Sequence, residues 1–405
     1  MSITIRPATT DELPAVFGAL VRGFGFDPDE DDPNGSSLWA LLPAERTAIA
    51  FDGDRMVGTL GEYDLHVAVP GGARLSMAGT TIITVAASHR RRGVLRSMMA
   101  DHLDTVAGRG DPIAGLWASE AAIYGRFGYG CAADGVDYTL PGSQVVIAPP
   151  PDIAIEIIDS GAALDVLPAI YDRVAGRPGM LERTSARWEH EMLRDPPSRR
   201  EGKSALRHAV ATRSGEGVGY VTYRQKQEWE RVPEGTVNVE QLLAADTPVR
   251  RALVWFVAHL DLFPNVKMWN QPVDDPLVWE VADRRQLVRE VSDTLWIRIM
   301  DVPSALTARS YETDGTIVMG ITDPTRPSNS GAYRLDITDG SAVCSPTDEE
   351  AAVTMDIREL GALYLGGRSA VTLQRAGLIA GTRPAVAHLD RLFRTAAAPW
   401  CPEVF

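Results

Sequence analysis

The chain has 405 residues, of which 54 are acidic and 40 are basic, so its formal net charge is −14. The length predicts two or three domains, and 45% hydrophobic residues suffice for ordinary cores, which excludes a disordered or fibrous chain. The negative charge repels phosphate polymers and attracts cations, which argues against nucleic acid as a partner and favours polyamine-like molecules.

Signals for disulfides, metals and membranes are missing from the sequence. Cys131, Cys344 and Cys401 are far apart, and the histidines form no HExxH or HxH pair, so neither a disulfide framework nor a metal site is predicted. The longest apolar run, Ala252 to Ala258, is too short to span a bilayer, and the N-terminus does not resemble a signal peptide. We therefore expect a soluble cytoplasmic protein without a membrane span.

The first 145 residues alternate between strand-like and helix-like patterns. Period-two alternation and β-branched residues predict strands at 3–5, 47–51, 56–69, 75–85 and 113–118. Apolar residues at three- and four-residue spacing predict helices at 13–20 and 94–103, and a short helix over 121–127 ends at Gly128. Between them, residues 26–34, FDPDEDDPN, predict an acidic loop.

A linker separates this part from a second αβ pattern at 153–299. The linker is residues 144–152, which contain three consecutive prolines. In the second part, residues 242–261 are similar to residues 84–104. Setting Leu243 on Val85 places Arg250 on Arg92, Pro248 on Arg90 and Arg251 on Gly93. The match is short; if it is a duplication rather than chance, only the first copy has kept its loop.

From about residue 300 the pattern changes again. Strands are expected over 317–321, 333–337 and 353–357, and helices over 359–365 and 385–393. These elements predict a third, α+β domain. We therefore divide the chain into residues 1–145, 153–299 and 300–405.

The clearest chemical signal lies where the strand ending at Val85 meets the helix starting near Val94. A helix start leaves backbone N–H groups unpaired, and Gly93 lets this backbone approach a ligand closely. Four positive side chains stand here in an otherwise acidic chain: Arg90, Arg91, Arg92 and Arg96. The pattern predicts a phosphate-bearing ligand, although it is neither a P-loop nor a dinucleotide fingerprint. The alternative is a basic helix start that only improves solubility.

These residues resemble a known superfamily. VAASHRRRGVL, residues 85–95, is similar to the acyl-CoA loop of the GCN-five-related N-acetyltransferases (GNAT), with Arg90 and Gly93 at signature places and Leu95 replacing the usual small residue. IYGRFGYG, residues 123–130, resembles the tyrosine-containing helix of that superfamily. The similarity extends to residues 296–311, residues 360–367 and the terminal Phe405 in the Eis (enhanced intracellular survival) family of aminoglycoside acetyltransferases.

The resemblance implies a fold and a set of residue roles. It implies two acetyltransferase folds in tandem, the second degenerate, followed by a sterol-carrier-protein-like domain, and a hexamer built as a trimer of dimers. The residues that would bind acetyl-CoA, the implied co-substrate, are Ile83, Thr84, Val85, Arg90, Arg91, Arg92, Gly93, Val94, Leu95, Arg96, Ser119 and Glu120. Tyr124 would be the general acid, and the terminal carboxylate of Phe405 the general base. The alternative for Tyr124 is a helix tyrosine packed on the core, and without the resemblance Phe405 would be taken for a frayed terminus.

For the substrate side, Asp27, Trp39 and Glu403 are the candidates, because acidic groups and an indole ring hold polycations by charge and stacking. A solvated acidic loop is the alternative for residues 27–32, and Val404 stands where the family usually has an acidic residue. We expect acetyl transfer from acetyl-CoA to primary amines of aminoglycoside-like polyamines, without a metal. The alternatives are acetylation of lysine in proteins or peptides, and a non-enzymatic lipid or small-molecule carrier.

Overall fold

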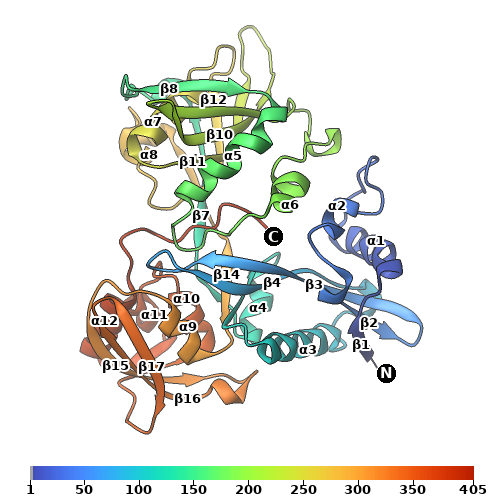
Figure 1. The fold of residues 1–405 in the computed structure, drawn as a ribbon, viewed down its shortest axis with the longest axis vertical. Helices are drawn as coiled ribbons and strands as arrows, with labels where there is room; N and C mark the ends of the chain where they lie inside the picture. The colour runs from blue at the N-terminus through green and yellow to red at the C-terminus, as the bar shows by residue number, and fades with distance from the viewer. Residues whose placement is uncertain (1–2) are drawn as a thin grey trace. The chain divides into compact units, whose positions relative to one another are not determined.

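The computed structural model describes residues 3–405, and the strands of this range form three mixed sheets (Figure 1). The range divides into two compact units. One comprises the described residues up to 133 together with 177–182 and 293–405, and the other comprises 134–176 and 183–292. Each unit therefore combines segments that are far apart in the sequence.

The first sheet consists of β1 (Ile3–Pro7), β2 (Thr47–Asp52), β3 (Arg55–Ala68), β4 (Arg74–Val85), β5 (Ile113–Trp117), β14 (Leu295–Ile299) and β6 (Gly130–Cys131), in this order. Neighbouring strands are antiparallel except β4 and β5, which run parallel. A tight turn at Asp52-Gly53-Asp54, with Gly53 at a φ of 60°, joins β2 to β3 as the sequence predicts.

Helices cover both faces of this sheet. On one face, α3 (Val94–Arg109) and α4 (Ala121–Tyr124) bury Met98, Leu103 and their apolar neighbours against β3, β4 and β5 (Figure 1). On the opposite face, α1 (Leu13–Phe24) buries Val16, Phe17 and Leu20. The short helix α2 (Ser36–Trp39) follows the predicted acidic loop.

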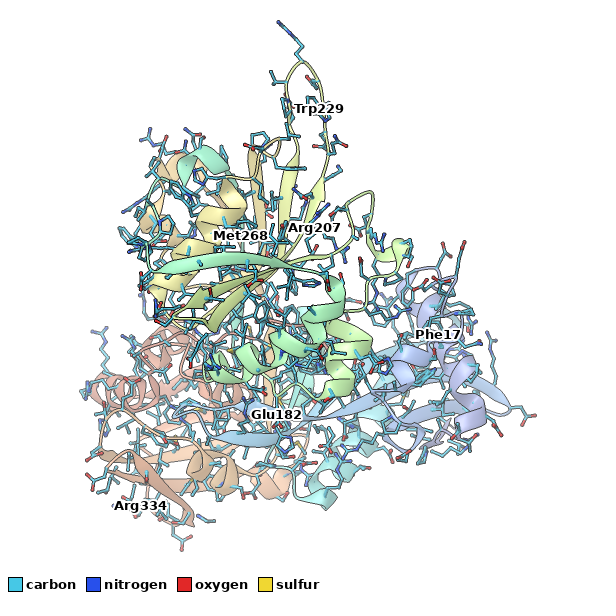
Figure 2. All side chains as sticks on the ribbon, turned by 45° about the horizontal axis from the view of Figure 1, so that its top comes forward. Phe17, Glu182, Arg207, Trp229, Met268 and Arg334 are labelled. Carbon is cyan, nitrogen blue, oxygen red and sulfur yellow. The ribbon has the colours of Figure 1, made fainter. Side chains whose placement is uncertain are left out.

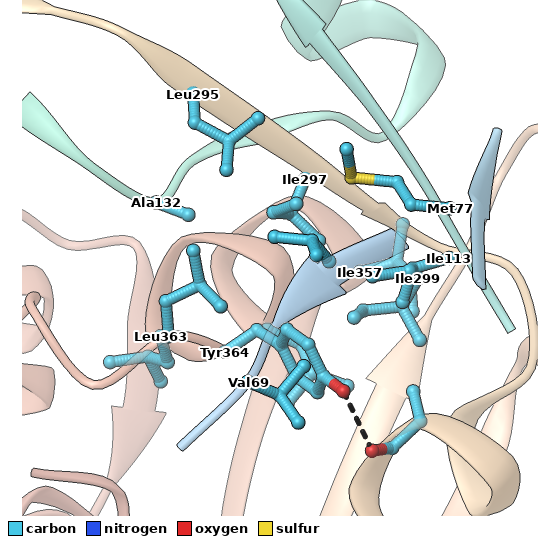
Figure 3. Packing of buried hydrophobic residues seen from close by; sticks show 14 of the residues in the cluster. Val69, Met77, Ile113, Ala132, Leu295, Ile297, Ile299, Ile357, Leu363 and Tyr364 are labelled. Atoms are coloured by element: carbon cyan, nitrogen blue, oxygen red, sulfur yellow. Dashed lines mark hydrogen bonds between the residues drawn. The ribbon is translucent and has the colours of Figure 1, made fainter. Parts of the chain in front are cut away.

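The C-terminal part of the first unit has its own sheet. Its strands, in spatial order, are β17 (Ser341–Thr347), β16 (Gly331–Thr338), β15 (Gly315–Thr322), β18 (Val353–Asp356) and β19 (Ile379–Gly381), and its helices are α9 (Val302–Ala308), α10 (Ile357–Leu363), α11 (Ala370–Arg375) and α12 (Arg383–Phe393). Figure 3 shows Ile357 and Tyr364 packed among side chains of the first sheet such as Ile297. The C-terminal part and the first sheet therefore share one apolar core.

The second sheet consists of β13 (Val288–Asp293), β7 (Asp134–Pro141), β12 (Asn265–Pro272), β11 (Thr236–Ala244), β10 (Glu216–Lys226), β9 (Arg207–Arg213) and β8 (Ile153–Ile158), in this order. Its helices are α5 (Ser160–Val174), α6 (Ser185–Arg187), α7 (Thr247–Ala258) and α8 (Leu277–Glu280). Here β11 and β12 are the parallel pair, at the place that β4 and β5 occupy in the first sheet.

The sheets exchange strands between the two halves of the tandem. Strand β14 lies between β5 and β6, whereas β7 lies between β12 and β13. Sequence patterns did not indicate this exchange, because an apolar strand such as LWIRI fits the interior of either sheet. The domain boundaries predicted at 145 and 299 stay a prediction. β7 lies before the first boundary but completes the second sheet, and β14 ends at the second boundary but completes the first sheet.

Most elements predicted from the sequence are confirmed within a few residues. β2 to β5, α1, α3, α10 and α12 lie where the patterns placed them, and residues 145–152 contain neither helix nor strand. The prediction missed α9, α11, β17 and β19. Within residues 3–405 no helix combines the length and apolar character that crossing a bilayer requires.

Candidate active site

The candidate site begins where two parallel strands separate. The pairing of β4 with β5 covers Met77–Gly79 and Ile113–Gly115 and ends there, while β4 continues to Val85 beside β3 alone. Ile82 marks a bulge in β4: its φ is 42°, and the register with β3 shifts around it. Because a bulge bends a strand, β4 diverges from β5 and presents an unpaired edge over residues 80–85. An extended ligand can pair with such an edge.

The loop after β4 is fixed by a buried histidine and two left-handed residues. His89 Nε2 lies 3.3 Å from Asp52 Oδ2 on β2, and Arg91 and Gly93 have φ values of 62° and 85°. Gly93 caps α3 without any side-chain hydrogen bond. Within residues 3–405, the backbone N–H groups of Val94, Leu95 and Arg96 donate to no protein acceptor. These donors at the positive end of the helix dipole suit an anion.

The four arginines predicted from the sequence surround this helix start. Arg90, Arg91, Arg92 and Arg96 are exposed, and within the described part of the chain none of their guanidinium groups has an ion-pair or hydrogen-bond partner. Solvated like charges at one place repel each other, so the cluster costs free energy unless a ligand neutralises it. The loop therefore combines backbone N–H groups that have no acceptor with arginine side chains that have no ion-pair partner in the described part of the chain.

The tyrosine predicted as an acid follows β5 in the chain. After β5, Ser119 and Glu120 are exposed, and Tyr124 at the end of α4 is only 6% exposed. Burial raises the pKa of the Tyr124 hydroxyl, and a hydrogen bond with the Ser119 side chain offsets this effect only in part. The phenol is therefore protonated at neutral pH and can serve as a proton donor.

The C-terminus is buried, which is unusual for a chain end. Phe405 is 8% exposed and packs in the core that the first sheet shares with the C-terminal part, and Glu403 is 3% exposed. The ring of Tyr124 belongs to the separate core under α3. The interpretation of Phe405 as a frayed end is therefore wrong; its role as a base stays a prediction.

Known proteins resemble this chain in sequence and in fold. Residues 4–132 and residues 179–299 each match an acetyltransferase (GNAT) domain, and residues 302–402 match a sterol carrier protein domain. N-acetyltransferase Eis of Mycobacterium bovis is 34% identical over 93% of this chain and 92% of its own length. The crystal structure of Eis1 from Mycobacterium abscessus has a TM-score of 0.86 at 31% identity, with 100% of both chains covered.

The chain belongs to the Eis family of N-acetyltransferases. An uncharacterized N-acetyltransferase of Streptomyces avermitilis is also 38% identical over the whole length of both chains. The predicted fold class is confirmed: two acetyltransferase domains stand in tandem before a sterol-carrier-like domain. The two domain matches agree with the repeated fold that the short internal echo suggested, while the residue alignment of the echo stays a prediction.

In this Eis-family chain, the acidic loop before α2 has two kinds of carboxylate. Asp27 is exposed to solvent. Asp32 instead is buried and accepts hydrogen bonds from Ser36 and Ser37, which hold its pKa below the ordinary value although burial opposes this. Trp39 is half-buried, and its indole N–H donates to the Asn34 carbonyl oxygen at 2.9 Å. Asp32 is thus an internal cap, and Asp27 and Trp39 stay substrate-site predictions.

A buried polar chain behind Tyr124 was missed by sequence reasoning. Tyr129 packs edge-to-face against Tyr124 with ring centroids 6.3 Å apart. Its hydroxyl lies 3.0 Å from Thr80 Oγ1, which lies 2.9 Å from His102 Nε2. His102 Nδ1 lies 3.4 Å from Glu62, whose carboxylate is paired with Arg46 and Arg109. Burial lowers the pKa of His102 to about 3, so the ring is neutral. The sequence signal for this polar chain is the presence of polar residues at inward positions of β3, β4 and α3.

The glycines of the tyrosine motif are required by close packing. A Cβ on Gly130 would lie 1.9 Å from the carbonyl oxygen of Arg358 in α10, and one on Gly128 would lie 2.8 Å from the guanidinium carbon of Arg298. Arg298 forms a fully buried ion pair with Asp323 of the C-terminal part, at 2.6 Å. The segment that carries Tyr124 is therefore packed against the sterol-carrier-like domain.

Proposed function

We propose that this N-acetyltransferase transfers an acetyl group from acetyl-CoA to primary amines of aminoglycoside-like polyamines. The observation that carries the proposal is the junction of β4 and α3, where unpaired backbone donors and four uncommitted arginines adjoin the open edge of a strand. The anionic and extended parts of acetyl-CoA match these two features.

In this proposal the backbone of Ile83, Thr84 and Val85 pairs with the pantetheine arm. Arg90, Arg91, Arg92 and Arg96, with the N–H groups that follow Gly93, hold the pyrophosphate, and Ser119 and Glu120 line the opposite side. The helix dipole contributes only about 0.3–1 kcal/mol per charge, so charge-assisted hydrogen bonds from the arginines supply most of the attraction.

The chemical step needs one acid and one base. The amine nitrogen attacks the thioester carbonyl carbon, the carbon–sulfur bond breaks, and the Tyr124 hydroxyl gives its proton to the departing sulfur. The Phe405 carboxylate accepts the proton that the amine loses. A buried carboxylate is a better base than one in water, because burial disfavours its charged form. General acid–base catalysis contributes about 10²–10⁴-fold, and positioning of the reactants supplies much of the rest.

The substrate preference rests on charge. A chain of net charge −14 attracts polycations, and Asp27, Trp39 and Glu403 are the proposed contacts. Lysine peptides are the second enzymatic candidate, and the ratio of kcat/KM for a kanamycin-like amine to that for a lysine peptide separates the two. The family resemblance also implies a hexamer, which sedimentation of the purified chain tests.

Two variants test the proposed chemistry. Tyr124→Phe keeps the buried ring and removes the proton, and we expect kcat to fall about 10²–10⁴-fold with acetyl-CoA affinity unchanged. Tyr223→Phe is the matched control, since Tyr223 is also buried and packs edge-to-face, on Phe256 at 5.9 Å. One glycine added after Phe405 moves the carboxylate by about 3.5 Å. Full turnover by the extended chain would remove Phe405 from the mechanism.

Calorimetry with acetyl-CoA distinguishes the enzyme from a carrier. We expect binding heat from the wild-type chain and its loss when Arg91, Arg92 and Arg96 are replaced together by methionine. The match of residues 302–402 to a sterol carrier protein domain favours the carrier as the second candidate. Lipid uptake without any heat from acetyl-CoA would support that alternative instead.

A further inference from the structure

The C-terminal tail, residues 398–405, is held in place far more firmly than a chain end usually is. Trp400, Cys401 and Phe405 are all buried, and Cys401 Sγ lies 3.2 Å from the Glu403 carbonyl oxygen across a tight turn. Chain ends fray unless specific contacts hold them. The contacts that fix this tail also fix the carboxylate of the proposed base, because the tail carries that carboxylate.

The anchor of the tail is a short segment, Arg177 to Met180. Arg177 Nε donates to the Ala398 carbonyl oxygen at 2.6 Å, and the Trp400 N–H donates to the Pro178 carbonyl oxygen at 2.8 Å. Upstream of these bonds, the nearest backbone anchor is the Ala396 N–H on Glu312 Oε1, at 2.7 Å. The two bonds therefore join the segment to the tail backbone on either side of Pro399.

The backbone of Gly179 allows this close approach. Its φ is 94°, and a Cβ at this position would lie 3.0–3.2 Å from the backbone O, C and N atoms of Trp400. Only glycine combines this left-handed conformation with such a contact without strain. The two backbones therefore touch where a side chain would push them apart.

The same segment is also fixed to the first sheet. The Gly179 N–H donates to the Ala68 carbonyl oxygen at 2.8 Å, and the Ala68 N–H donates to the Met180 carbonyl oxygen at 2.8 Å. Two residues on, the Glu182 N–H donates to the His66 carbonyl oxygen; Figure 2 labels Glu182 beside the strands of this sheet. The tail is thus attached through the segment to β3, which pairs with β4 along the candidate active site.

We infer that Arg177, Pro178 and Gly179 are positioning residues that hold the tail so that the Phe405 carboxylate is presented to the amine. This inference rests on the proposed function. The segment acts through the tail and contacts no reacting atom. The segment lies at the start of the residues that match the second acetyltransferase domain, outside those that match the first.

The test uses two variants of the full chain, Arg177→Met and Gly179→Ala, each with a matched control. Arg173→Met is the control for the first, because Arg173 also donates to a backbone carbonyl oxygen, that of Gly217 at 2.6 Å. Gly215→Ala is the control for the second, because Gly215 has a φ of 83° and nothing within 4 Å of its Cβ position. The controls lose the same kind of bond or gain the same backbone strain away from the tail.

Each protein is measured by hydrogen exchange of the peptide 396–405, by kcat for a kanamycin-like amine and by calorimetry with acetyl-CoA. We expect both anchor variants to exchange at least about 10-fold faster in this peptide. Arg177→Met removes the bond to the Ala398 carbonyl oxygen, and Gly179→Ala pushes the Trp400 backbone away from its acceptor on Pro178. We expect kcat to fall about 10–100-fold, because a displacement of about 1 Å has effects of this size, with acetyl-CoA affinity unchanged. The controls should match the wild type in all three measurements.

Unchanged exchange in both variants would overturn the anchor, and faster exchange with full kcat would overturn its positioning role. A restored kcat in Arg177→Lys, which can donate to the same carbonyl, would support it. If the wild-type chain itself acetylates no amine, the proposed function fails. The exchange rates would still report on the anchor, so the two failures are distinguishable.

Discussion

The two acetyltransferase domains place the same structural elements at two strand-to-helix junctions, β4 to α3 and β11 to α7. In both, a parallel neighbour leaves the strand before its end: β5 leaves β4 after Gly79, and β12 leaves β11 after Val239. In both, a helix follows the strand: α3 starts at Val94 after β4 ends at Val85, and α7 starts at Thr247 after β11 ends at Ala244. The backbone framework for an extended ligand is therefore present twice.

The two helix starts differ in the groups that accept hydrogen bonds from their first backbone N–H groups. At α7, the Asp246 side chain caps the helix by accepting from the Val249 N–H at 2.9 Å, and Pro248 has no N–H to offer. The Asp246 carboxylate in turn binds Arg213 at 2.7 Å. The second junction thus carries its own anion, whereas the first, capped by Gly93, leaves its donors free.

The arginines differ in the same way. Arg92 is exposed and uncommitted, whereas Arg250, its counterpart in the sequence echo, is buried with two carboxylates. Arg250 pairs with Asp275, with Nε 2.6 Å from Oδ2, and with Glu280 at 2.7 Å. Burial opposes the charge, but the two carboxylates raise the pKa of Arg250 above its ordinary value. The position that holds an exposed arginine, unpaired within residues 3–405, at the first junction therefore holds a buried structural arginine at the second.

The largest expected effect tests this change of role directly. Arg250→Met should lower the free energy of unfolding by about 3–5 kcal/mol, because it leaves Asp275 and Glu280 buried without a partner. Arg92→Met should change it by less than about 0.5 kcal/mol, since exposed substitutions have small effects. Urea unfolding of both variants measures the difference.

The same pair should give the opposite order in ligand binding. Arg92→Met should weaken acetyl-CoA binding about 10-fold, the loss of one charge-assisted hydrogen bond, whereas folded Arg250→Met should bind as the wild type does. Calorimetry below the unfolding transition checks this. Equal stability of the two variants would contradict the division of roles between the junctions.

The sequence predicted the first junction well because its signals are local. Gly93, the four arginines and Tyr124 all lie within short motifs whose backbone context the period of the apolar residues defines. The second junction was recognised as damaged at Pro248 and Arg251, but its ion cluster needed Asp275 and Glu280, which only the fold brings to Arg250. The chain from Tyr129 to Glu62 was missed for the same reason, since it depends on the register of β3 and β4.

The anchor of the tail was beyond sequence reasoning as well. Residues 177 and 398 are 221 positions apart, and the backbone bonds between their neighbours carry no side-chain signal. The exchange of β7 and β14 between sheets is a similar case, because edge and interior strands of alternating pattern look alike until their partners are known.

The next largest effect comes from giving the first junction the carboxylate of the second. Gly93→Asp should weaken acetyl-CoA binding about 100-fold, because a charge near the free N–H groups both occupies them and repels phosphate. Gly93→Asn is the matched control, with nearly the same shape, tolerance of left-handed φ and no charge. We expect it to weaken binding only a few-fold by calorimetry. Equal losses in the two variants would indicate steric blocking instead of competition for the anion site.

A smaller effect concerns the helices that follow the junctions. α3 buries His102, whereas the buried residues of α7 include no histidine. Because burial lowers the pKa of His102 to about 3, the folded ring stays neutral while the unfolded one takes up a proton below its ordinary pKa of about 6.5. Stability from this group is complete above about pH 6.5 and is lost as the pH falls towards 3.

His102→Gln should therefore flatten the acid side of the stability profile. Between pH 6.5 and 5, the wild type should lose about 2 kcal/mol more than the variant, the linkage expected for one such group. His66→Gln is the control, since the His66 side chain is 48% exposed. Urea unfolding at each pH measures both, and parallel profiles for wild type and His102→Gln would show that another group causes the acid sensitivity.

The smallest effect asks whether the second junction can be reopened. Asp246→Ala removes the cap of α7 and should cost about 1 kcal/mol of stability in urea unfolding, a typical value for a lost N-cap. It should yield no new acetyl-CoA binding in calorimetry, because Arg250 and Arg251 remain held by Asp275 and Glu280 and Pro248 still lacks a donor. A second binding site in this variant would mean that the Asp246 carboxylate alone prevents acetyl-CoA from binding at the second junction. The buried ion cluster of Arg250, Asp275 and Glu280 would then have no part in preventing it.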